Sequence, residues 1–111
     1  MEFRASHRYA PITPTKVRPV VDLIRGKHVN DALQILRATP NRGAHLVDRV
    51  LQSAMANADQ SLEADMENLR VQKAWVDGGP IRRKVRPAPR LRRSIIRSQS
   101  SHINIVLDDG Q

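Results

Sequence analysis

A run of 19 residues, 79–97, is the feature that most constrains this chain, because it carries eight bases and no acid. Those bases are Arg82, Arg83, Lys84, Arg86, Arg90, Arg92, Arg93 and Arg97. The rest of the chain holds 11 Lys and Arg against 11 Asp and Glu, so the formal net charge of +8 comes from this run. Such a run is usually disordered or held against a polyanion, because like charges repel one another. A solvated basic tail is an alternative, but this run is internal and a predicted strand follows it.

Length and composition exclude several classes of protein. With 111 residues, the chain forms one small domain rather than two. It has no Cys, which excludes a disulfide framework and a zinc ribbon and is typical of a reducing compartment. No apolar run approaches the roughly 20 residues of a membrane-spanning helix, and the amino-terminal residues 1–4 lack the apolar stretch of a secretory signal. We therefore expect a single domain that is neither secreted nor inserted in a membrane.

The first 26 residues predict a strand and a helix. Residues 2–9 alternate between polar residues and Phe3, Ala5, His7 and Tyr9, which predicts a half-buried strand with a basic outer face. Thr13 and Pro14 then match an N-cap hydroxyl and a proline at the first helical position. Apolar residues follow at helical spacing, and Gly26 supplies a left-handed stop. Pro19 inside this helix should bend or weaken it.

Two more helices and two more strands complete the predicted fold. One helix runs from Asn30 to just before Pro40, and a longer one begins near Asn41. The apolar stripe of the longer helix is Leu46, Val47, Val50, Leu51, Ala54 and Ala58. Residues 69–77 and 102–107 have the composition of strands. The predicted fold class is α+β, with three helices packed on one side of a three-stranded antiparallel sheet.

The two later strands flank the basic run, so the run becomes the far end of a long hairpin. We predict a single domain, 1–111, in which residues 79–100 form an extended basic β-hairpin arm. Two legs of about nine residues reach roughly 30 Å at about 3.3 Å per residue. Pro87 and Pro89 cannot donate ladder hydrogen bonds, so regular pairing should fail near the tip. A lone two-stranded ribbon is marginal in water, and we expect an arm that is mobile when free and ordered by its partner.

Signatures of catalysis and of metal binding are missing from the sequence. His7, His28, His45 and His102 have no metal-ligand spacing and are predicted to be surface or strand-packing residues. The acids between residues 59 and 67 cluster in a predicted polar loop, and residues 78–80 are too short for a phosphate-cradling loop and predict a turn or bulge. No nucleophile has a plausible base beside it. The chain is predicted not to be an enzyme and to need no metal or cofactor.

Nucleic-acid binding fits the basic run better. Arg outnumbers Lys seven to one there, and guanidinium groups give planar, bidentate donors to phosphate. Such binding is electrostatic and depends on salt. The chain has only three aromatic residues, and Trp75 is predicted to lie in the core, so no platform for bases is expected. The sequence therefore predicts recognition of backbone and shape, with the arm inserted into folded RNA.

Two alternatives compete with RNA binding. Leu91, Ile95 and Ile96 among the bases could lie on an anionic membrane, but the prolines and the few large apolar residues disfavour this surface. An architectural DNA-binding protein with a basic, proline-containing arm is the stronger rival. Proteins of that kind usually dimerise around two arms, and the sequence has no evident dimer seam. DNA binding is kept as the alternative function, and no membrane partner is predicted.

Five motifs, in order along nearly the whole chain, resemble the family of large-subunit ribosomal protein uL22. They are Thr15-Lys16-Val17-Arg18, Val21-Asp22-Leu23-Ile24-Arg25-Gly26-Lys27, Ser53-Ala54-Met55-Ala56-Asn57-Ala58, Trp75-Val76-Asp77-Gly78-Gly79-Pro80 and Ser101-His102-Ile103. The basic arm lies between the last two motifs, where that family has its arm. The resemblance implies a structural constituent of the cytoplasmic large subunit that binds large-subunit ribosomal RNA and helps assembly by bridging RNA domains.

The resemblance also implies where the parts of the chain lie and what they contact. The hairpin would line the nascent-peptide exit tunnel, near the place where macrolide antibiotics bind, and the partners would include neighbouring large-subunit proteins and the nascent polypeptide. The RNA-binding residues carried over are Lys16, Arg18, Arg25, Lys27, Arg82, Arg83, Lys84, Arg86, Arg90, Arg92, Arg93, Arg97 and His102. The tunnel-lining tip would consist of Pro87, Ala88, Pro89, Arg90, Leu91 and Arg92.

Overall fold

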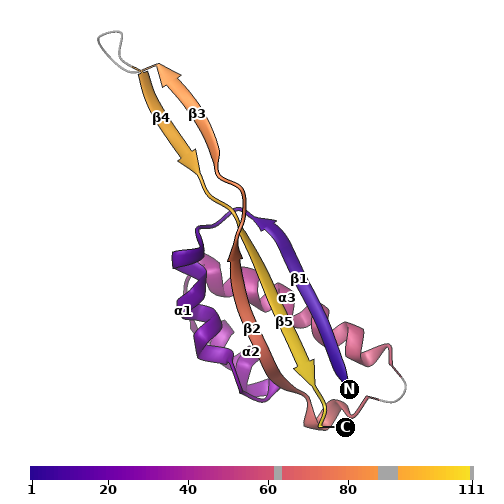
Figure 1. Ribbon diagram of the computed structural model, residues 1–111. Coiled ribbons are helices and arrows are strands. Elements are labelled where there is room, and N and C mark those ends of the chain that lie inside the picture. Colours follow the sequence, from indigo (N-terminus) through magenta and orange to yellow (C-terminus); the bar gives the residue numbers. More distant parts are fainter. Residues whose placement is uncertain (62–63, 88–92, 111) are drawn as a thin grey trace.

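The computed structural model describes residues 1–61, 64–87 and 93–110 and has a body from which a two-stranded arm extends (Figure 1). The elements are β1 (Glu2–Ala10), α1 (Pro14–Ile24), α2 (Val29–Ala38), α3 (Arg42–Asp59), the 3₁₀ turn η1 (Met66–Asn68), β2 (Arg70–Gly78), β3 (Arg82–Pro87), β4 (Arg93–Ser98) and β5 (Ser101–Asp108). The molecule measures 63 × 24 × 17 Å along its principal axes, and the arm lies along the long one. The predicted α+β class is confirmed.

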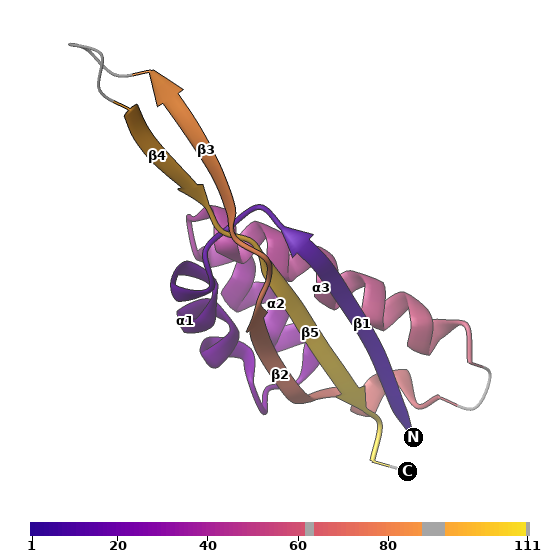
Figure 2. The same ribbon diagram turned by 45° about the horizontal axis from the view of Figure 1, so that its top comes forward.

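The body is an antiparallel sheet in the order β1-β5-β2 with helices on one face. Because β5 is the central strand, it bonds to both neighbours and its inward residues Ile103, Ile105 and Leu107 are fully buried. Helix α3 packs against β1 and β5, and α1 packs against β2. Figures 1 and 2 show all three helices behind the sheet, so its other face has no helix over it. The helical face carries the hydrophobic core.

A bulge in β1 changes the predicted alternation of that strand. The register shifts between His7, which pairs with Ile103, and Ala10, which pairs with Ser101. Tyr9 takes a positive φ of 60° inside the bulge and is 60% exposed, while Ala10 is fully buried in its place. The prediction that Tyr9 shares an inward face with Phe3 is therefore wrong. The extra residue in β1 turns the Tyr9 side chain away from the core, which is a common effect of a β-bulge.

A second bulge, in β2, decides which face holds the large aromatic residue. The register shifts between Val71 and Lys73, so Val71, Ala74 and Val76 all point into the core. Trp75 consequently lies on the uncovered face and is 38% exposed. The prediction that Trp75 belongs to the core is wrong, because the bulge inverts the alternation that follows it.

Helix α1 follows the predicted pattern except at its N-terminal cap. Gly26 has the predicted positive φ, 79°, just after the helix, and its N–H donates to the Val71 carbonyl at 2.9 Å. Thr13 occupies the N-cap position, but its hydroxyl makes no cap hydrogen bond, contrary to prediction. The helix continues through Pro19, which is exposed, while Val17, Val20, Val21 and Ile24 are buried. Burial of that apolar stripe offsets the backbone hydrogen bond that proline cannot make.

Side-chain caps begin the other two helices. His28 Nδ1 accepts a hydrogen bond from the Asn30 N–H, so α2 begins at Val29, one residue before the predicted start. Asn41 Oδ1 accepts one from the Ala44 N–H at 2.8 Å and starts α3 near the predicted position. Every residue of the predicted α3 stripe is buried. In α2, Leu36 is buried and Leu33 and Ile35 are half-buried.

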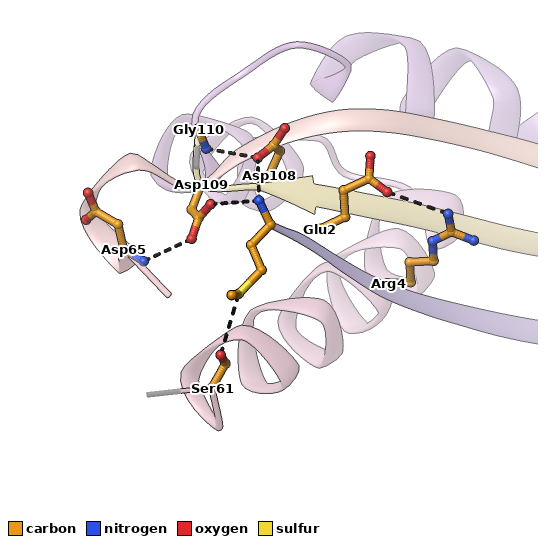
Figure 3. Close-up of polar contacts among 8 residues, drawn as sticks. Glu2, Arg4, Ser61, Asp65, Asp108, Asp109 and Gly110 are labelled. Carbon is orange, nitrogen blue, oxygen red and sulfur yellow. Dashed lines mark hydrogen bonds and ion pairs between the residues drawn. The ribbon is translucent and has the colours of Figure 1, made fainter. Parts of the chain in front are cut away.

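Two carboxylates make hydrogen bonds and ion pairs at the end of the sheet opposite the arm (Figure 3). Asp109 is buried, and its Oδ2 accepts a hydrogen bond from the Asp65 N–H at 3.2 Å. The amino group of Met1 lies 3.3 Å from Asp109 Oδ1 and 3.6 Å from Asp108 Oδ1. These contacts join β1, β5 and the loop before η1. Both ends of the described chain therefore lie far from the arm (Figure 1).

The arm leaves the body through a close backbone crossing. Gly79 N–H donates to the Ser100 carbonyl at 2.9 Å, and the Ser100 hydroxyl donates to the Pro80 carbonyl at 3.1 Å. The buried Ser101 hydroxyl donates to the Ile12 carbonyl at 2.6 Å and ties the crossing to the body. Residues 78–80, where a turn or bulge was predicted, thus connect the end of β2 to the arm.

The two legs of the arm then pair in a regular antiparallel ladder. The register runs from Arg82 opposite Ser98 to Pro87 opposite Arg93. Pro87 ends β3, which suits a residue that cannot donate to a ladder. The predicted failure of pairing around Pro89 concerns positions outside the described residues.

Gly79 should tolerate no side chain. A Cβ built there would meet the Ser100 hydroxyl and lie 3.2 Å from the Ser100 carbonyl carbon, whereas one built on Gly78 meets nothing within 4 Å. We predict that Gly79→Ala lowers the free energy of unfolding by about 1–3 kcal/mol through overpacking. The matched variant Gly78→Ala should stay within about 0.5 kcal/mol of wild type. Urea unfolding measures the stability of both variants, and equal stability would contradict the close approach of Gly79 to Ser100.

Candidate nucleic-acid interface

The arm carries the predicted bases on two paired strands. Arg82 and Arg83 begin β3 and are exposed. The register places Arg83 opposite Arg97. Three further predicted bases lie in the same ladder, namely Lys84, Arg86 and Arg93.

Part of the predicted arm lies outside the described residues. Arg90 and Arg92 belong to this part, as do Ala88, Pro89 and Leu91 of the predicted tip. Pro87 is the last residue of β3 and the only predicted tip residue that the structure describes.

The body adds cations where the arm begins. Lys16 at the start of α1 and Arg42 at the start of α3 are both exposed. Together with residues 98 and 99 of the returning strand they line a pocket of about 380 Å³. Lys16 was predicted as a binding residue and Arg42 was not. Only the packing of α1 against α3 brings Arg42 to the arm, and the sequence around Arg42 carries no signal of that approach.

Arg18 and Arg25 are engaged with the edge of the sheet. Arg25 donates from Nε and Nη2 to the Ala74 carbonyl at 3.1 and 2.7 Å, and its Nη1 lies 2.8 Å from Asp22 Oδ1. Arg18 Nη2 donates to the Val76 carbonyl at 3.3 Å. These bonds occupy carbonyls along the outer edge of β2, which would otherwise be open to pairing with another strand. The structure thus gives these two predicted RNA-binding residues a role inside the protein.

Lys27 and His102 lie at opposite ends of the body. Lys27 is exposed after α1, and its carbonyl accepts a hydrogen bond from the Val71 N–H at 2.9 Å. His102 is half-buried near the arm, and its Nδ1 accepts from the Tyr9 N–H at 3.0 Å. The rings of His102 and Tyr9 meet edge to face with centroids 4.9 Å apart. The predicted binding residues therefore do not form one compact cluster.

Trp75 is the exposed aromatic of the uncovered sheet face. Its Nε1 donates to Asp77 Oδ2 at 3.2 Å, and the amide of Asn104 lies 3.4 Å from the same oxygen. This carboxylate fixes the indole and the amide on adjacent strands. The bulge that exposes Trp75 depends on pairing with β5, so periodicity within residues 69–77 could not reveal it.

The described ranges contain neither a membrane-spanning helix nor a cluster of metal ligands. No helix there is long and apolar enough to cross a membrane. No group of three or more His, Cys, Asp or Glu within residues 1–61, 64–87 and 93–110 is placed to hold a metal ion. The cationic surfaces of the arm and of its root are thus the candidate site.

Comparison with known proteins identifies the family. A family model described as ribosomal protein L22p/L17e matches residues 5–108. The chain belongs to this family. Large ribosomal subunit protein uL22 of Thermoanaerobacter sp. (strain X514) is 49% identical over 111 residues and covers 100% of both chains. The protein of the same name from Geobacter sulfurreducens is 45% identical over 111 residues, again with 100% of both chains covered. That from Pelotomaculum thermopropionicum is 45% identical, over 98% of this chain and 96% of its own.

Membership sets the general role of the chain. It is a structural protein of the large ribosomal subunit in the cytoplasm, with ribosomal RNA and other ribosomal proteins as partners. Proteins of this family are structural constituents and are not, in general, enzymes. The resemblance carried by the five sequence motifs is confirmed.

Arg25 and Lys16 should respond differently to truncation, because only Arg25 bonds to the sheet edge. We predict that Arg25→Ala lowers the free energy of unfolding by about 1–2 kcal/mol, since it removes two charge-assisted hydrogen bonds to the Ala74 carbonyl. Lys16→Ala should change it by less than about 0.5 kcal/mol. Urea unfolding of both variants tests this, and an Arg25→Ala protein as stable as Lys16→Ala would show that the edge bonds contribute nothing.

Proposed function

We propose that this chain binds large-subunit ribosomal RNA through its arm and the arm's root, and that it helps assembly by holding separate RNA domains together. The observation that carries the proposal is the acid-free basic arm, which projects from a body whose own charges balance. The long axis of 63 Å lets one molecule reach RNA at the arm and at the body. Two such contacts, far apart, suit a bridging role.

Electrostatics supports RNA as the partner of the arm. Among the residues that the structure describes, ion pairs lie in the body, at Met1, Glu2–Arg4 and Asp22–Arg25. None of them engages Arg82 or Arg83, so these guanidinium groups keep their donors for an outside anion. Phosphate is the anion that guanidinium binds in bidentate geometry. Binding of this kind releases counterions and weakens as salt rises.

The family resemblance supports a finer placement of the arm. We propose that the hairpin lines the nascent-peptide exit tunnel, with residues 87–92 facing the nascent polypeptide close to the region where macrolides bind. The protein acts there as a structural element and carries out no catalysis. A photoreactive amino acid at position 89 should crosslink to a nascent chain stalled in the tunnel, and crosslinks to RNA alone would contradict the tunnel placement.

An architectural DNA-binding role is the alternative, since a basic ribbon with proline also fits a bent duplex. It predicts similar affinity for duplex DNA and for folded RNA. Competition between large-subunit ribosomal RNA and random duplex DNA separates the two roles. Displacement of the RNA at equal concentrations of phosphate would favour the DNA-binding role.

Neutralising the base of the arm should flatten the salt dependence of RNA binding. For the double variant Arg82→Gln/Arg83→Gln, the slope of log K against log salt should fall in magnitude by up to about two, one for each phosphate that the protein no longer neutralises. The matched variant Arg37→Gln/Arg49→Gln has the same net charge, but its changes lie on the exposed surface of α2 and α3. It should keep the wild-type slope.

Filter binding to purified large-subunit ribosomal RNA over a range of salt measures these slopes. An equal loss of slope in both double variants would mean that net charge alone governs binding. Wild-type binding that does not weaken with salt would contradict the electrostatic proposal altogether.

A further inference from the structure

The root of the arm holds a pocket next to an exposed aromatic ring. This arm-root pocket has a volume of about 270 Å³ and is lined by Tyr9, Pro11, Pro80, Arg82 and residues 98–100. It lies where β1 ends, where the chain enters the arm and where it returns. Its volume falls just below the roughly 300–1,000 Å³ of most small-molecule pockets, which suits one planar ring rather than a whole ligand.

The backbone holds Tyr9 toward this pocket at an energetic cost. Tyr9 has a φ of 60°, and it is the one described residue other than glycine with a positive φ. Bulky residues rarely adopt this conformation, and such outliers cluster at functional sites. The core does not need the ring, because Ala10 fills the inward position. A strained backbone that exposes a large apolar ring to solvent points to a use for that ring outside the protein.

Neighbouring side chains fix the Tyr9 ring and leave most of it open. His102 packs edge to face against it, with its Nδ1 bound to the Tyr9 N–H. The guanidinium carbon of Arg8 lies 5.9 Å from the ring centroid. The residue is nevertheless 60% exposed. A ring held in one orientation loses little conformational entropy when a second flat ring stacks on it.

Four cations lie in or near the arm-root pocket. Arg82 lines it, and Arg8 lies beside Tyr9. The next pocket shares Pro11 and residues 98–99 with it and carries Lys16 and Arg42. Within the described residues no ion pair joins any of these four cations to a carboxylate. A nucleic-acid strand offers both the flat rings and the phosphates that such a surface would bind.

From these observations we infer that the arm-root pocket binds one unpaired nucleobase of ribosomal RNA, stacked on Tyr9, with the flanking phosphates against Arg82 and Lys16. This inference rests on the proposed RNA-binding function and adds recognition of a base to that of backbone and shape. Stacking of this kind tolerates any of the four bases, because each has a π-face.

The test separates stacking from charge. In Tyr9→Gly the ring is removed and the positive φ becomes unstrained, so the variant should fold as wild type does. We expect it to bind large-subunit ribosomal RNA roughly 5- to 100-fold more weakly at fixed salt, with an unchanged salt slope. Tyr9→Phe keeps the ring and should bind within about twofold of wild type, whereas Arg82→Gln should flatten the slope.

Each outcome decides between the proposals. If Tyr9→Gly binds protein-free RNA as tightly as wild type does, the inferred base site is wrong and the proposed function stands. This result is expected if the Tyr9 ring contacts a neighbouring protein instead of a base. If wild type itself shows no salt-dependent binding, the proposed function fails and the inferred base site with it. Circular dichroism and thermal melting check the fold. If Tyr9→Gly melts early, ultraviolet crosslinking of the wild-type complex decides, and the absence of a crosslink at residue 9 overturns the inference.

Discussion

Pairing of β5 with both β1 and β2 is the constraint on which the molecule depends. This strand is the last element within the described residues, yet it occupies the centre of the sheet and supplies three fully buried apolar residues. The segment between β2 and β5 must therefore leave the sheet and return to it at the same end. The crossing of Gly79 with Ser100 fixes that point, and the Ser101 hydroxyl anchors it to the Ile12 carbonyl. The arm follows from the topology of the body.

Acidic and basic residues are distributed differently in the body and in the arm. The body has as many acids as bases, and its own side chains bond to backbone groups at the border of the sheet. Arg25 bonds to the outer edge of β2, and Asp109 bonds to the neighbouring loop at the end of the sheet opposite the arm. The arm has eight bases and no acid, and its like charges repel one another in water. A ribbon of two strands has little core to offset that repulsion. The proposed binding to ribosomal RNA would give the arm a polyanion as its surroundings.

Periodicity within single segments predicted the helices and the three-stranded sheet, because one buried face dictates each of them, and the basic run between two predicted strands predicted the arm. It could not predict the two bulges, since each depends on pairing with β5, which lies about 30 or more residues away in sequence. Those bulges expose Tyr9 and Trp75, so the aromatic surface was missed. The roles of Arg25 and Arg42 were missed for the same reason. A basic residue that bonds to a neighbouring strand and one that lies free beside the arm look alike in sequence.

We infer that ribosomal RNA stabilises the basic two-stranded arm, which is only weakly stable in the free protein. Amide hydrogen exchange, measured on the free protein and on its complex with large-subunit ribosomal RNA, tests this most directly. We expect fast exchange in β3 and β4 of the free protein and strong protection in the complex, with little change in β5 and α3. Equal exchange of β3 and β4 in the two states would contradict it.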